Sequence, residues 1–346
     1  MSTSTRLVLV ASFAVVLAWT ACRTRRSELR VYTWADYFKP AVVARFERQE
    51  DCRVVVDTFD SNEAMYAKLK AGASGYDVIT PSSYMVQVME RQGMLLALDH
   101  GELANLVNVD RTILAAMIDR EMHHSVPYML TITGLAYLGG RVADFRPTWA
   151  MLDRRDLAGR MTMLNDMRET IGAALKFLGY SLNSTDEVEI GRARDVVIRW
   201  ERNLAKLENE QYKSGLASGE FLLVHGYSGD ILQVQRENRD IVFAVPQEGA
   251  SFACDDLVIQ KSAANVALAY RFINFLHDPG VAAENTEFLS YLCPNSASYA
   301  LLSEATRANP ALFPSPEVRA RCEIIVDLGP ANVLYTRAWD AIKTAR

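Results

Sequence analysis

The stretch "LRVYTWADYFKPAVVARFERQEDCRVVVDTFDSNEAMYAKLKAGASGYDVITP", Leu29 to Pro81, alternates between two kinds of pattern. Three segments rich in β-branched and aromatic residues, "LRVYTW", "CRVVVDTF" and "YDVITP", predict strands. Between them, "KPAVVARFERQE" and "SNEAMYAKLKAG" have the spacing of amphipathic helices, with Pro40 near the start of the first and Gly72 closing the second. This β-α-β-α-β order predicts the opening of a parallel sheet in an α/β fold.

The same alternation continues along the chain. "SSYMVQVMERQG" predicts a helix with Ser82 or Ser83 as its N-cap, and "HSVPYMLTITGLAYL" supplies two strand-like runs near residue 130. "GRMTML" and "NDMRETIGAALKFLGY" form a further βα unit, so a second α/β set is expected over residues 130–250. "DIVFAVPQEG" and "DDLVIQ" predict strands, and "SAANVALAYRFINFLHDP" predicts a helix capped by Ser262 or Asn265. These elements favour two α/β lobes with a ligand cleft between them.

The composition is that of an ordinary soluble protein. Half of the 346 residues are apolar, and 42 acidic side chains stand against 37 basic ones. A chain of this length can bury two hydrophobic cores. The net charge of -5 and the lack of a basic tract argue against a nucleic-acid partner, because nothing supplies a phosphate-neutralising surface. A cationic ligand fits this balance better.

The N-terminus has the pattern of a targeting segment. Arg6 precedes "LVLVASFAVVLAW", an uncharged run of 13 residues from Leu7 to Trp19, too short to span a bilayer as a helix. The following "TAC" resembles a bacterial lipoprotein signal, in which cleavage before Cys22 leaves that cysteine to carry a lipid anchor. Trp19 stands where the usual motif has Leu, so simple secretion and a retained N-terminal anchor stay open. Export is the leading prediction.

Several catalytic motifs are absent from the sequence. "HGYSGD", His225 to Asp230, misses the G-x-S-x-G pattern of serine hydrolases. The chain has no G-x-G-x-x-G, Walker or H-x-x-x-H motif and no C-x-x-C, so neither nucleotide chemistry nor a metal site is expected. The widely spaced cysteines are either buried free thiols or members of one or two disulfides: Cys52, Cys254, Cys293 and Cys322.

Asp166 and Glu169 lie three residues apart at the start of a predicted helix, so they share one face. They suit a capping box, and they equally suit an anionic clamp at a strand-to-helix turn. As an acid–base pair for glycoside hydrolysis they would lie too close and too parallel to flank a scissile bond.

Aromatic and acidic residues gather in the predicted turns, including Trp34, Asp36, Tyr37 and Tyr84. This combination suits an organic cation. An aromatic face attracts a cation by roughly 0.5–2 kcal/mol, and a charge-assisted hydrogen bond to a carboxylate adds about 1.5–3 kcal/mol. Taken singly, each tyrosine is as well explained by core packing.

From Leu29 to the C-terminus the chain resembles the bacterial spermidine/putrescine-binding proteins, the extracytoplasmic substrate-binding subunits of polyamine ABC transporters. The likeness is strongest in "VYTWADY", "SNEAMYAKLKAGASGYDVITPSSYMVQVMERQGML", "LNDMRETIGAALKFLGYS", "EGASFACDDLVI" and "YLCPN". The resemblance implies a type II periplasmic-binding fold, no enzymatic activity and no cofactor. It also implies a monomer that closes around its ligand by a hinge motion and then docks on a membrane permease.

The resemblance assigns ligand-binding roles to ten residues: Trp34, Asp36, Tyr37, Ser82, Tyr84, Asp166, Glu169, Tyr227, Asp255 and Tyr291. It favours the clamp over the cap for Asp166 and Glu169. Two positions depart from the spermidine-binding members. Ala253 stands where they have Trp, leaving a wall that is missing or supplied by a residue such as Phe252, and Ile325 stands where they have Gln. The preference between spermidine and putrescine is therefore open, and so are another small cation, an amino-acid derivative, or a sensor role.

The resemblance also implies lobes assembled from separate stretches. We expect a signal peptide at residues 1–21 and a linker at 22–28. The N-terminal lobe is expected to comprise residues 29–129 and 254–301, and the C-terminal lobe residues 130–253 and 302–346.

Overall fold

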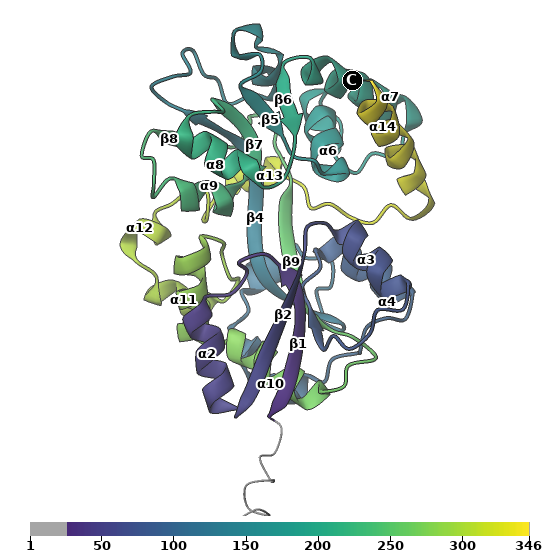
Figure 1. Ribbon diagram of the computed structural model, residues 1–346, viewed down its shortest axis with the longest axis vertical. Helices are drawn as coiled ribbons and strands as arrows, with labels where there is room; N and C mark the ends of the chain where they lie inside the picture. The colour runs from purple at the N-terminus through teal and green to yellow at the C-terminus, as the bar shows by residue number, and fades with distance from the viewer. Residues whose placement is uncertain (1–25, 346) are drawn as a thin grey trace, which may run out of the picture.

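The computed structural model describes residues 26–345 and divides into two halves, as Figure 1 shows. The signal peptide expected at residues 1–21 and Cys22 lie outside the described residues. Both halves share one run of strands: β1 (Ser27–Trp34), β2 (Cys52–Phe59), β3 (Val78–Ile79), β4 (Ser125–Leu138), β5 (Met161–Met163), β6 (Leu204–Leu207), β7 (Leu223–Tyr227), β8 (Ile241–Ala244) and β9 (Phe252–Ile259).

The strand order is β2-β1-β3-β9-β4-β7-β5-β6, with β8 paired to β4. The predicted parallel opening is confirmed, since β1 pairs in parallel with both β2 and β3. β9 then enters antiparallel between β3 and β4, although it comes more than a hundred residues later in the chain. β5 pairs in parallel with β6 and β7 in the other half. The sheet is therefore mixed, and β9 brings a distant segment beside the first strands.

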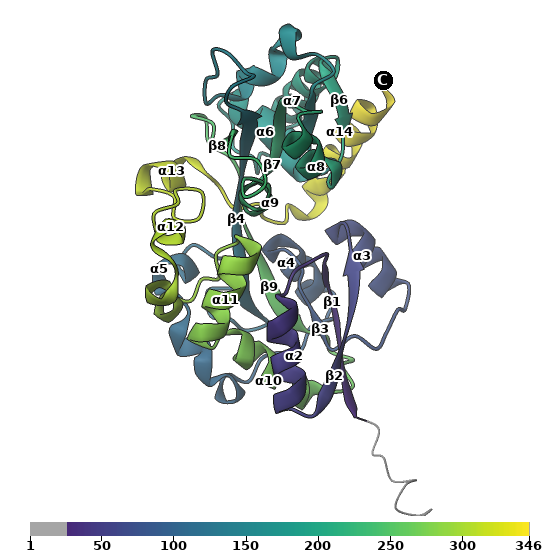
Figure 2. The same ribbon diagram turned by 60° about the vertical axis from the view of Figure 1, so that its left-hand side comes forward.

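The prediction of two short strands near residue 130 is wrong, because β4 is one continuous strand from Ser125 to Leu138. Nearly every residue of β4 is buried, so the run shows no alternation that would mark a break. Its first half pairs with β9 and its second half with β7 and β8. Figures 1 and 2 show β4 and β9 passing side by side from one half to the other. These two strands form the connection at the base of the cleft.

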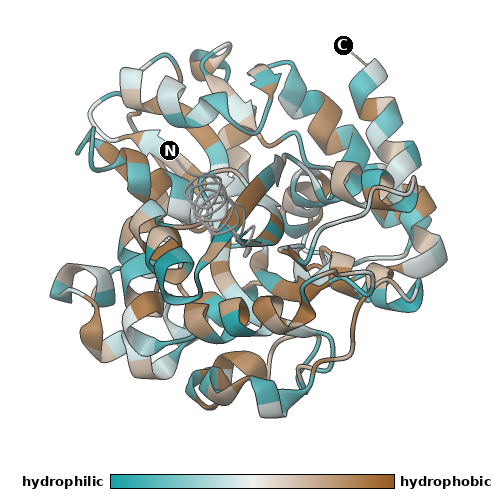
Figure 3. Ribbon diagram, turned by 60° about the horizontal axis from the view of Figure 1, so that its bottom comes forward, coloured by the Kyte–Doolittle hydropathy of each residue, from teal (hydrophilic) through white to brown (hydrophobic). Residues whose placement is uncertain are grey.

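Helices cover the strands of each half: α2 (Pro40–Gln49), α3 (Asn62–Lys70), α4 (Ser83–Arg91), α5 (Arg111–Leu114), α6 (Met167–Phe177), α7 (Glu187–Glu201), α8 (Gln211–Ser218), α9 (Ser228–Val234), α10 (Val266–Leu276), α11 (Pro279–Leu289), α12 (Glu304–Arg307), α13 (Pro316–Arg321) and α14 (Asn332–Thr344). Pro40 occupies the first turn of α2, as predicted. Asn265 lies at the N-cap position of α10 but makes no side-chain cap. Along the outer helices, hydrophobic and hydrophilic residues alternate in Figure 3, as expected for helices with one buried face.

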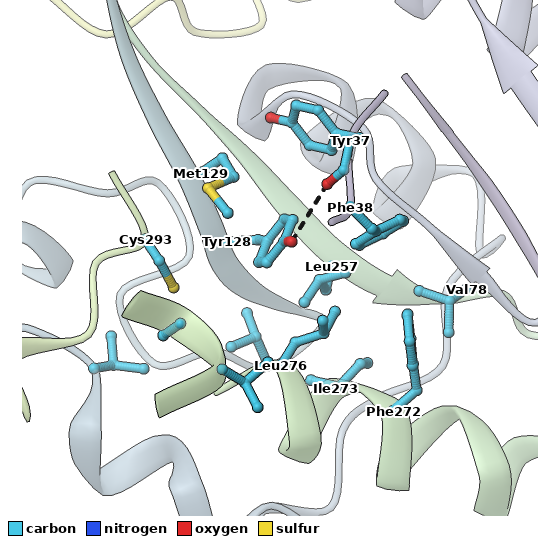
Figure 4. Close-up of a cluster of buried hydrophobic side chains, with 14 of the residues drawn as sticks. Tyr37, Phe38, Val78, Tyr128, Met129, Leu257, Phe272, Ile273, Leu276 and Cys293 are labelled. Carbon is cyan, nitrogen blue, oxygen red and sulfur yellow. Dashed lines mark hydrogen bonds between the residues drawn. The ribbon is translucent and has the colours of Figure 1, made fainter. Parts of the chain in front are cut away.

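Separate hydrophobic clusters stabilise the two halves. The first packs Phe38, Tyr128 and Phe272 against one another, and Figure 4 shows the Tyr128 hydroxyl donating to the Tyr37 carbonyl oxygen, 3.4 Å away. The second cluster is built around Trp149 and Trp200. A third cluster, around Tyr32, Met65 and Met89, also lies in the first half, so the described residues form three clusters rather than the two cores expected.

Leu302, Ala311 and Leu312 belong to the first cluster, although we expected residues 302–346 in the C-terminal lobe. Figure 2 places α12 beside α5 and α11, in agreement with this packing. Tyr335 and Ile342 of α14 are buried in the second cluster. Phe313 packs against the first cluster too, edge-on to Tyr299, so these contacts favour a boundary after Phe313 rather than after residue 301.

The four cysteines of the described residues are free thiols, and Cys52, Cys254 and Cys293 are buried. Within residues 26–345, no helix has the length and apolar character needed to cross a membrane. The same residues contain no group of three or more His, Cys, Asp or Glu side chains that could hold a metal ion.

Gly249→Ala should destabilise the fold more than Gly72→Ala. Both glycines have positive φ, 91° and 96°, so each alanine carries a backbone cost of about 1–2 kcal/mol. A Cβ on Gly249 would also lie 1.9 Å from the Arg321 carbonyl oxygen, whereas nothing lies within 4 Å of a Cβ on Gly72. We expect a further loss of about 1–3 kcal/mol at Gly249. Urea unfolding measures both values, and equal losses would contradict this packing.

Candidate ligand-binding site

A cleft with a cavity volume of about 150 Å³ lies between the two halves. Its walls come from the loop after β1, the start of α4, the start of α6, helices α8 and α9, strand β9 and the segment at Ile324 and Ile325. All ten residues expected to bind a ligand line it: Trp34, Asp36, Tyr37, Ser82, Tyr84, Asp166, Glu169, Tyr227, Asp255 and Tyr291. The fold thus gathers them around one cavity from both halves of the molecule.

Asp255 lies on β9, opposite Met129 of β4, and faces the cleft. Tyr37 donates a hydrogen bond of 2.5 Å to Asp255 Oδ2, and Ser82 donates one of 2.6 Å to Asp255 Oδ1. Burial raises the pKa of this carboxyl to about 6, although the two hydrogen bonds lower it. Among the described residues Asp255 forms no salt bridge. Its charge is therefore held by neutral donors alone.

Ser82 is one of the two residues predicted to cap α4, and it also lines the cleft. It occupies the N-cap position of α4, but its hydroxyl makes no capping bond because it donates to Asp255 instead. Asn62 of α3 fixes this serine from both sides: its Nδ2 donates to Ser82 Oγ over 3.1 Å, and its Oδ1 accepts from the Ser82 amide over 3.0 Å. Ser82 is therefore oriented towards the cleft before any ligand arrives.

The capping hypothesis holds for Asp166 but not for Glu169, and the anionic clamp stays a prediction. Asp166 caps α6, accepting hydrogen bonds from the amides of Arg168 and Glu169 at 2.9 and 3.0 Å. Glu169 does not close a capping box, because its carboxylate accepts from Ser251 at 2.6 and 2.7 Å and from Thr133 at 3.2 Å. Both carboxylates line the cleft.

Burial raises the pKa of Glu169 to about 8, with the Asp166 charge as the next cause. Burial also raises the pKa of Asp166. Arg168 is the nearest arginine in sequence, yet it donates to the Val326 carbonyl and to Asn183 Oδ1, each over 2.9 Å, and lies 4.7 Å from the Tyr335 ring centroid. No salt bridge joins it to either carboxylate in the part of the chain that the structure describes. This pair thus lacks a bonded cation.

Aromatic rings form the walls between the carboxylates. The Trp34 and Phe59 rings lie 4.4 Å apart in an edge-on arrangement, and the Tyr37 and Tyr291 rings lie 6.2 Å apart. The indole nitrogen of Trp34 is buried and has no hydrogen-bond partner within residues 26–345. These rings offer faces to a cation and apolar surface to methylene groups.

The Tyr291 ring lies directly against the start of α9. A Cβ on Gly229 would come within 2.4 Å of this ring, so only glycine permits the contact. The Tyr291 hydroxyl donates to Asp230 Oδ1 over 2.8 Å, and Tyr212 donates to Asp230 Oδ2 over 2.5 Å. This explains Gly229 and Asp230 of the "HGYSGD" segment. His225 of the same segment is buried edge-on against Trp149, and Ser228 bonds to Thr131, so the segment does not form a Ser–His pair.

Both departures from the spermidine-binding pattern lie at the cleft. Ala253 and Ile325 line it. Phe252 does not, so the suggestion that it replaces the missing Trp is wrong. Side chains alternate along a strand, which places Phe252 on the face of β9 opposite Ala253 and Asp255, where it packs against the first cluster. Phe252 therefore supplies no aromatic wall beside Ala253.

Sequence reasoning missed further residues of the cleft, including Asn62, Phe59, Arg168, Lys213 and Asp230. Asn62 and Phe59 flank the turn after β2, so their position at a strand end was the available signal. Lys213 lies inside a helix with no motif, and nothing local indicates that it faces a cavity.

The sequence and the overall fold of the chain are similar to those of known proteins. The model of the family described as bacterial extracellular solute-binding protein matches residues 41–314. The chain belongs to this family. A solute-binding family agrees with our expectation that the protein is not an enzyme.

Relatives cover nearly the whole chain. The putrescine/cadaverine-binding protein of Pseudomonas aeruginosa is 35% identical over 98% of this chain and 99% of its own. The spermidine/putrescine-binding periplasmic protein of Escherichia coli is 31% identical over 98% of both chains. The structure of a putative spermidine/putrescine ABC transporter protein from Listeria monocytogenes has a TM-score of 0.88 and 30% identity, covering 92% of this chain and 100% of its own. A Treponema pallidum lipoprotein has a TM-score of 0.84 and 32% identity, covering 91% and 99%. The type II periplasmic-binding fold of this solute-binding protein is as predicted.

The free energy of unfolding of this solute-binding protein should fall as the pH rises from about 4.5 to about 8. Over that window Glu169 keeps its proton in the folded state but loses it in the unfolded state. One such carboxyl changes the unfolding free energy by up to about 1.4 kcal/mol per pH unit. Urea unfolding of the unliganded protein measures the slope, which Glu169→Gln should flatten and the exposed control Glu220→Gln should keep. An unchanged slope in Glu169→Gln would contradict the assignment.

Proposed function

We propose that this protein binds a polyamine outside the cytoplasm and delivers it to an ABC transporter in the membrane. The observation that carries the proposal is a cleft with carboxylates at Asp255 and at Asp166 and Glu169, aromatic rings between them, and no salt bridge to these three groups among the described residues. A linear cation with an ammonium at each end and methylenes between has the matching chemistry. Relatives that match nearly the full chain are named as putrescine- or spermidine-binding proteins, which supports this proposal.

In this proposal Asp255 accepts a hydrogen bond from one ammonium, and Asp166 and Glu169 accept from the other. Trp34, Tyr37, Tyr227 and Tyr291 flank the methylenes and present ring faces to the charges. Burying each CH₂ group stabilises the complex by about 0.8 kcal/mol. Asp36, Ser82 and Tyr84 complete the contacts around the ligand.

Closure of the two halves around the ligand follows from the connections between them. β4, β9 and the segment near Ile325 pass from one half to the other, and Asp327 of that segment forms an ion pair with Arg91 of α4. We propose lobes of residues 29–129 with 254–313 and of residues 130–253 with 314–346. A ligand that contacts both lobes stabilises their closed arrangement through its differential affinity.

Ala253 and Ile325 support a second candidate within the same fold. Without an aromatic wall at one position and an amide at the other, the cleft also suits another small organic cation or an amino-acid derivative, and such a protein could serve as a sensor.

We further propose that the protein acts as a monomer attached to the outer face of the cytoplasmic membrane by a lipid on Cys22. The "TAC" motif after an apolar run supports the anchor, and a relative from Treponema pallidum is titled a lipoprotein.

Residues 23–346 should bind at least one of putrescine, cadaverine, spermidine or spermine with micromolar or tighter affinity by calorimetry. Asp255→Asn should weaken that binding by about tenfold to a hundredfold, because it removes a charge-assisted hydrogen bond of about 1.5–3 kcal/mol.

The control for this change is Asp195→Asn, which removes an equal charge at an exposed ion pair with Arg194, outside the cleft. It should bind as the unchanged protein does. Binding of none of the four amines would refute the polyamine proposal, and binding of an amino-acid derivative instead would favour the second candidate.

Cells expressing the full chain should incorporate labelled palmitate into this protein, and Cys22→Ala should abolish the label. Fractionation should then move the variant from the membrane to the soluble extracytoplasmic fraction. The control Cys322→Ala alters a partly exposed thiol in the folded region and should leave labelling intact. An unlabelled native protein would disprove the anchor.

A further inference from the structure

Among residues 26–345, seven carboxylates line the cleft but only two basic side chains do, Arg168 and Lys213. The guanidinium of Arg168 is engaged by Val326 and Asn183 in the second half of the molecule. Lys213 of α8 differs, because its ammonium faces carboxylates of the cleft itself. Its Nζ lies 3.8 Å from Asp230 Oδ2 and 3.5 Å from Glu210 Oε2.

Lys213 also interacts electrostatically with Asp36 on the opposite wall of the cleft. Burial lowers its pKa, but the charges of Asp230, Glu210 and Asp36 together raise it above the ordinary value. Asp36 lies in the loop after β1, in the other half of the molecule. The lysine is therefore charged, and it lies between carboxylates of both halves at this end of the cleft.

The side chain of Lys213 has the same chemistry as one end of the ligand. It is a primary ammonium on four methylenes, the group that the cleft is proposed to recognise. Asp230 already accepts hydrogen bonds from Tyr212 and Tyr291, and it has the lysine ammonium as its counter-charge. A ligand ammonium placed there would meet a like charge and a carboxylate that is already neutralised.

We infer that Lys213 is a specificity-determining residue that fills the Asp230 end of the cleft and selects ligands with two ammonium groups over ligands with three. Among the described residues, Asp255, Asp166 and Glu169 have no bonded cation. In this inference Asp255 binds one ammonium group of the ligand, and Asp166 and Glu169 together bind the other. The third ammonium group of a ligand such as spermidine cannot bind at Asp230, because the Lys213 ammonium occupies that position. This inference rests on the proposed polyamine function.

Calorimetry of the folded protein with putrescine, cadaverine and spermidine tests it. The unchanged protein should bind a diamine more tightly than spermidine. Lys213→Met shortens the unbranched side chain by one heavy atom and removes the charge, so the affinity for spermidine relative to the diamine should rise about tenfold. Lys213→Gln, a second neutral variant, should show the same rise in relative spermidine affinity. Lys213→Arg keeps the charge and should keep the ratio of the two affinities found in the unchanged protein.

The matched control is Lys261→Met, which removes the same charge from an exposed lysine that does not line the cleft and should leave the ratio unchanged. The inference is overturned if both neutral variants are folded and keep the original ratio, or if they bind neither class of amine. These outcomes differ from failure of the proposed function, in which the unchanged protein itself binds no polyamine.

Discussion

The hydrogen bonds that Tyr37 and Ser82 donate to Asp255 are the interaction on which the site depends. Each partner comes from a different segment: the loop after β1, the turn before α4, and β9. They meet because β9 enters the sheet next to β3, which places the end of the chain's first strand beside a residue more than two hundred positions later. The sheet order therefore creates the carboxylate site, and the donors hold it in place without neutralising its charge.

The support of Tyr37 extends from the cleft into the core. Its carbonyl accepts from Tyr128, whose hydroxyl in turn accepts from Asn285 of α11, and Figure 4 shows Tyr128 between the loop and the buried cluster. The ring that bonds Asp255 is thus fixed by buried packing. A site fixed in this way needs little rearrangement on one wall when a ligand arrives, so closure can be carried by the other half.

Much of the fold was predictable because local patterns determine it. β1, β2 and α2 match their predicted segments closely, since their apolar spacing and Pro40 act within a few residues. The length of β4 was not predictable, because an almost fully buried strand has no alternation of apolar and polar residues that would mark its continuity. The ten site residues could be predicted as one set only because the family resemblance linked distant segments of the sequence. Without it, each residue alone was equally well explained by core packing. Lys213 carries no such motif, so its position in the cleft follows from tertiary structure alone, whereas the position of Asn62 after a strand was a usable signal.

The direction of the Arg168 side chain decides the electrostatics of the cleft. Arg168 lies between Asp166 and Glu169 in the sequence. If its guanidinium formed ion pairs with both carboxylates, their negative charge would not be available to bind a cationic ligand. Instead its guanidinium is bonded to Val326 and Asn183 and stacked on Tyr335, so its charge helps the pair only through space. Burial without a bonded cation keeps the carboxylates destabilised in the empty protein, as the raised pKa of Glu169 shows. In the proposed function, a cation bound by carboxylates of both walls relieves that penalty, and this gain favours closure on the ligand.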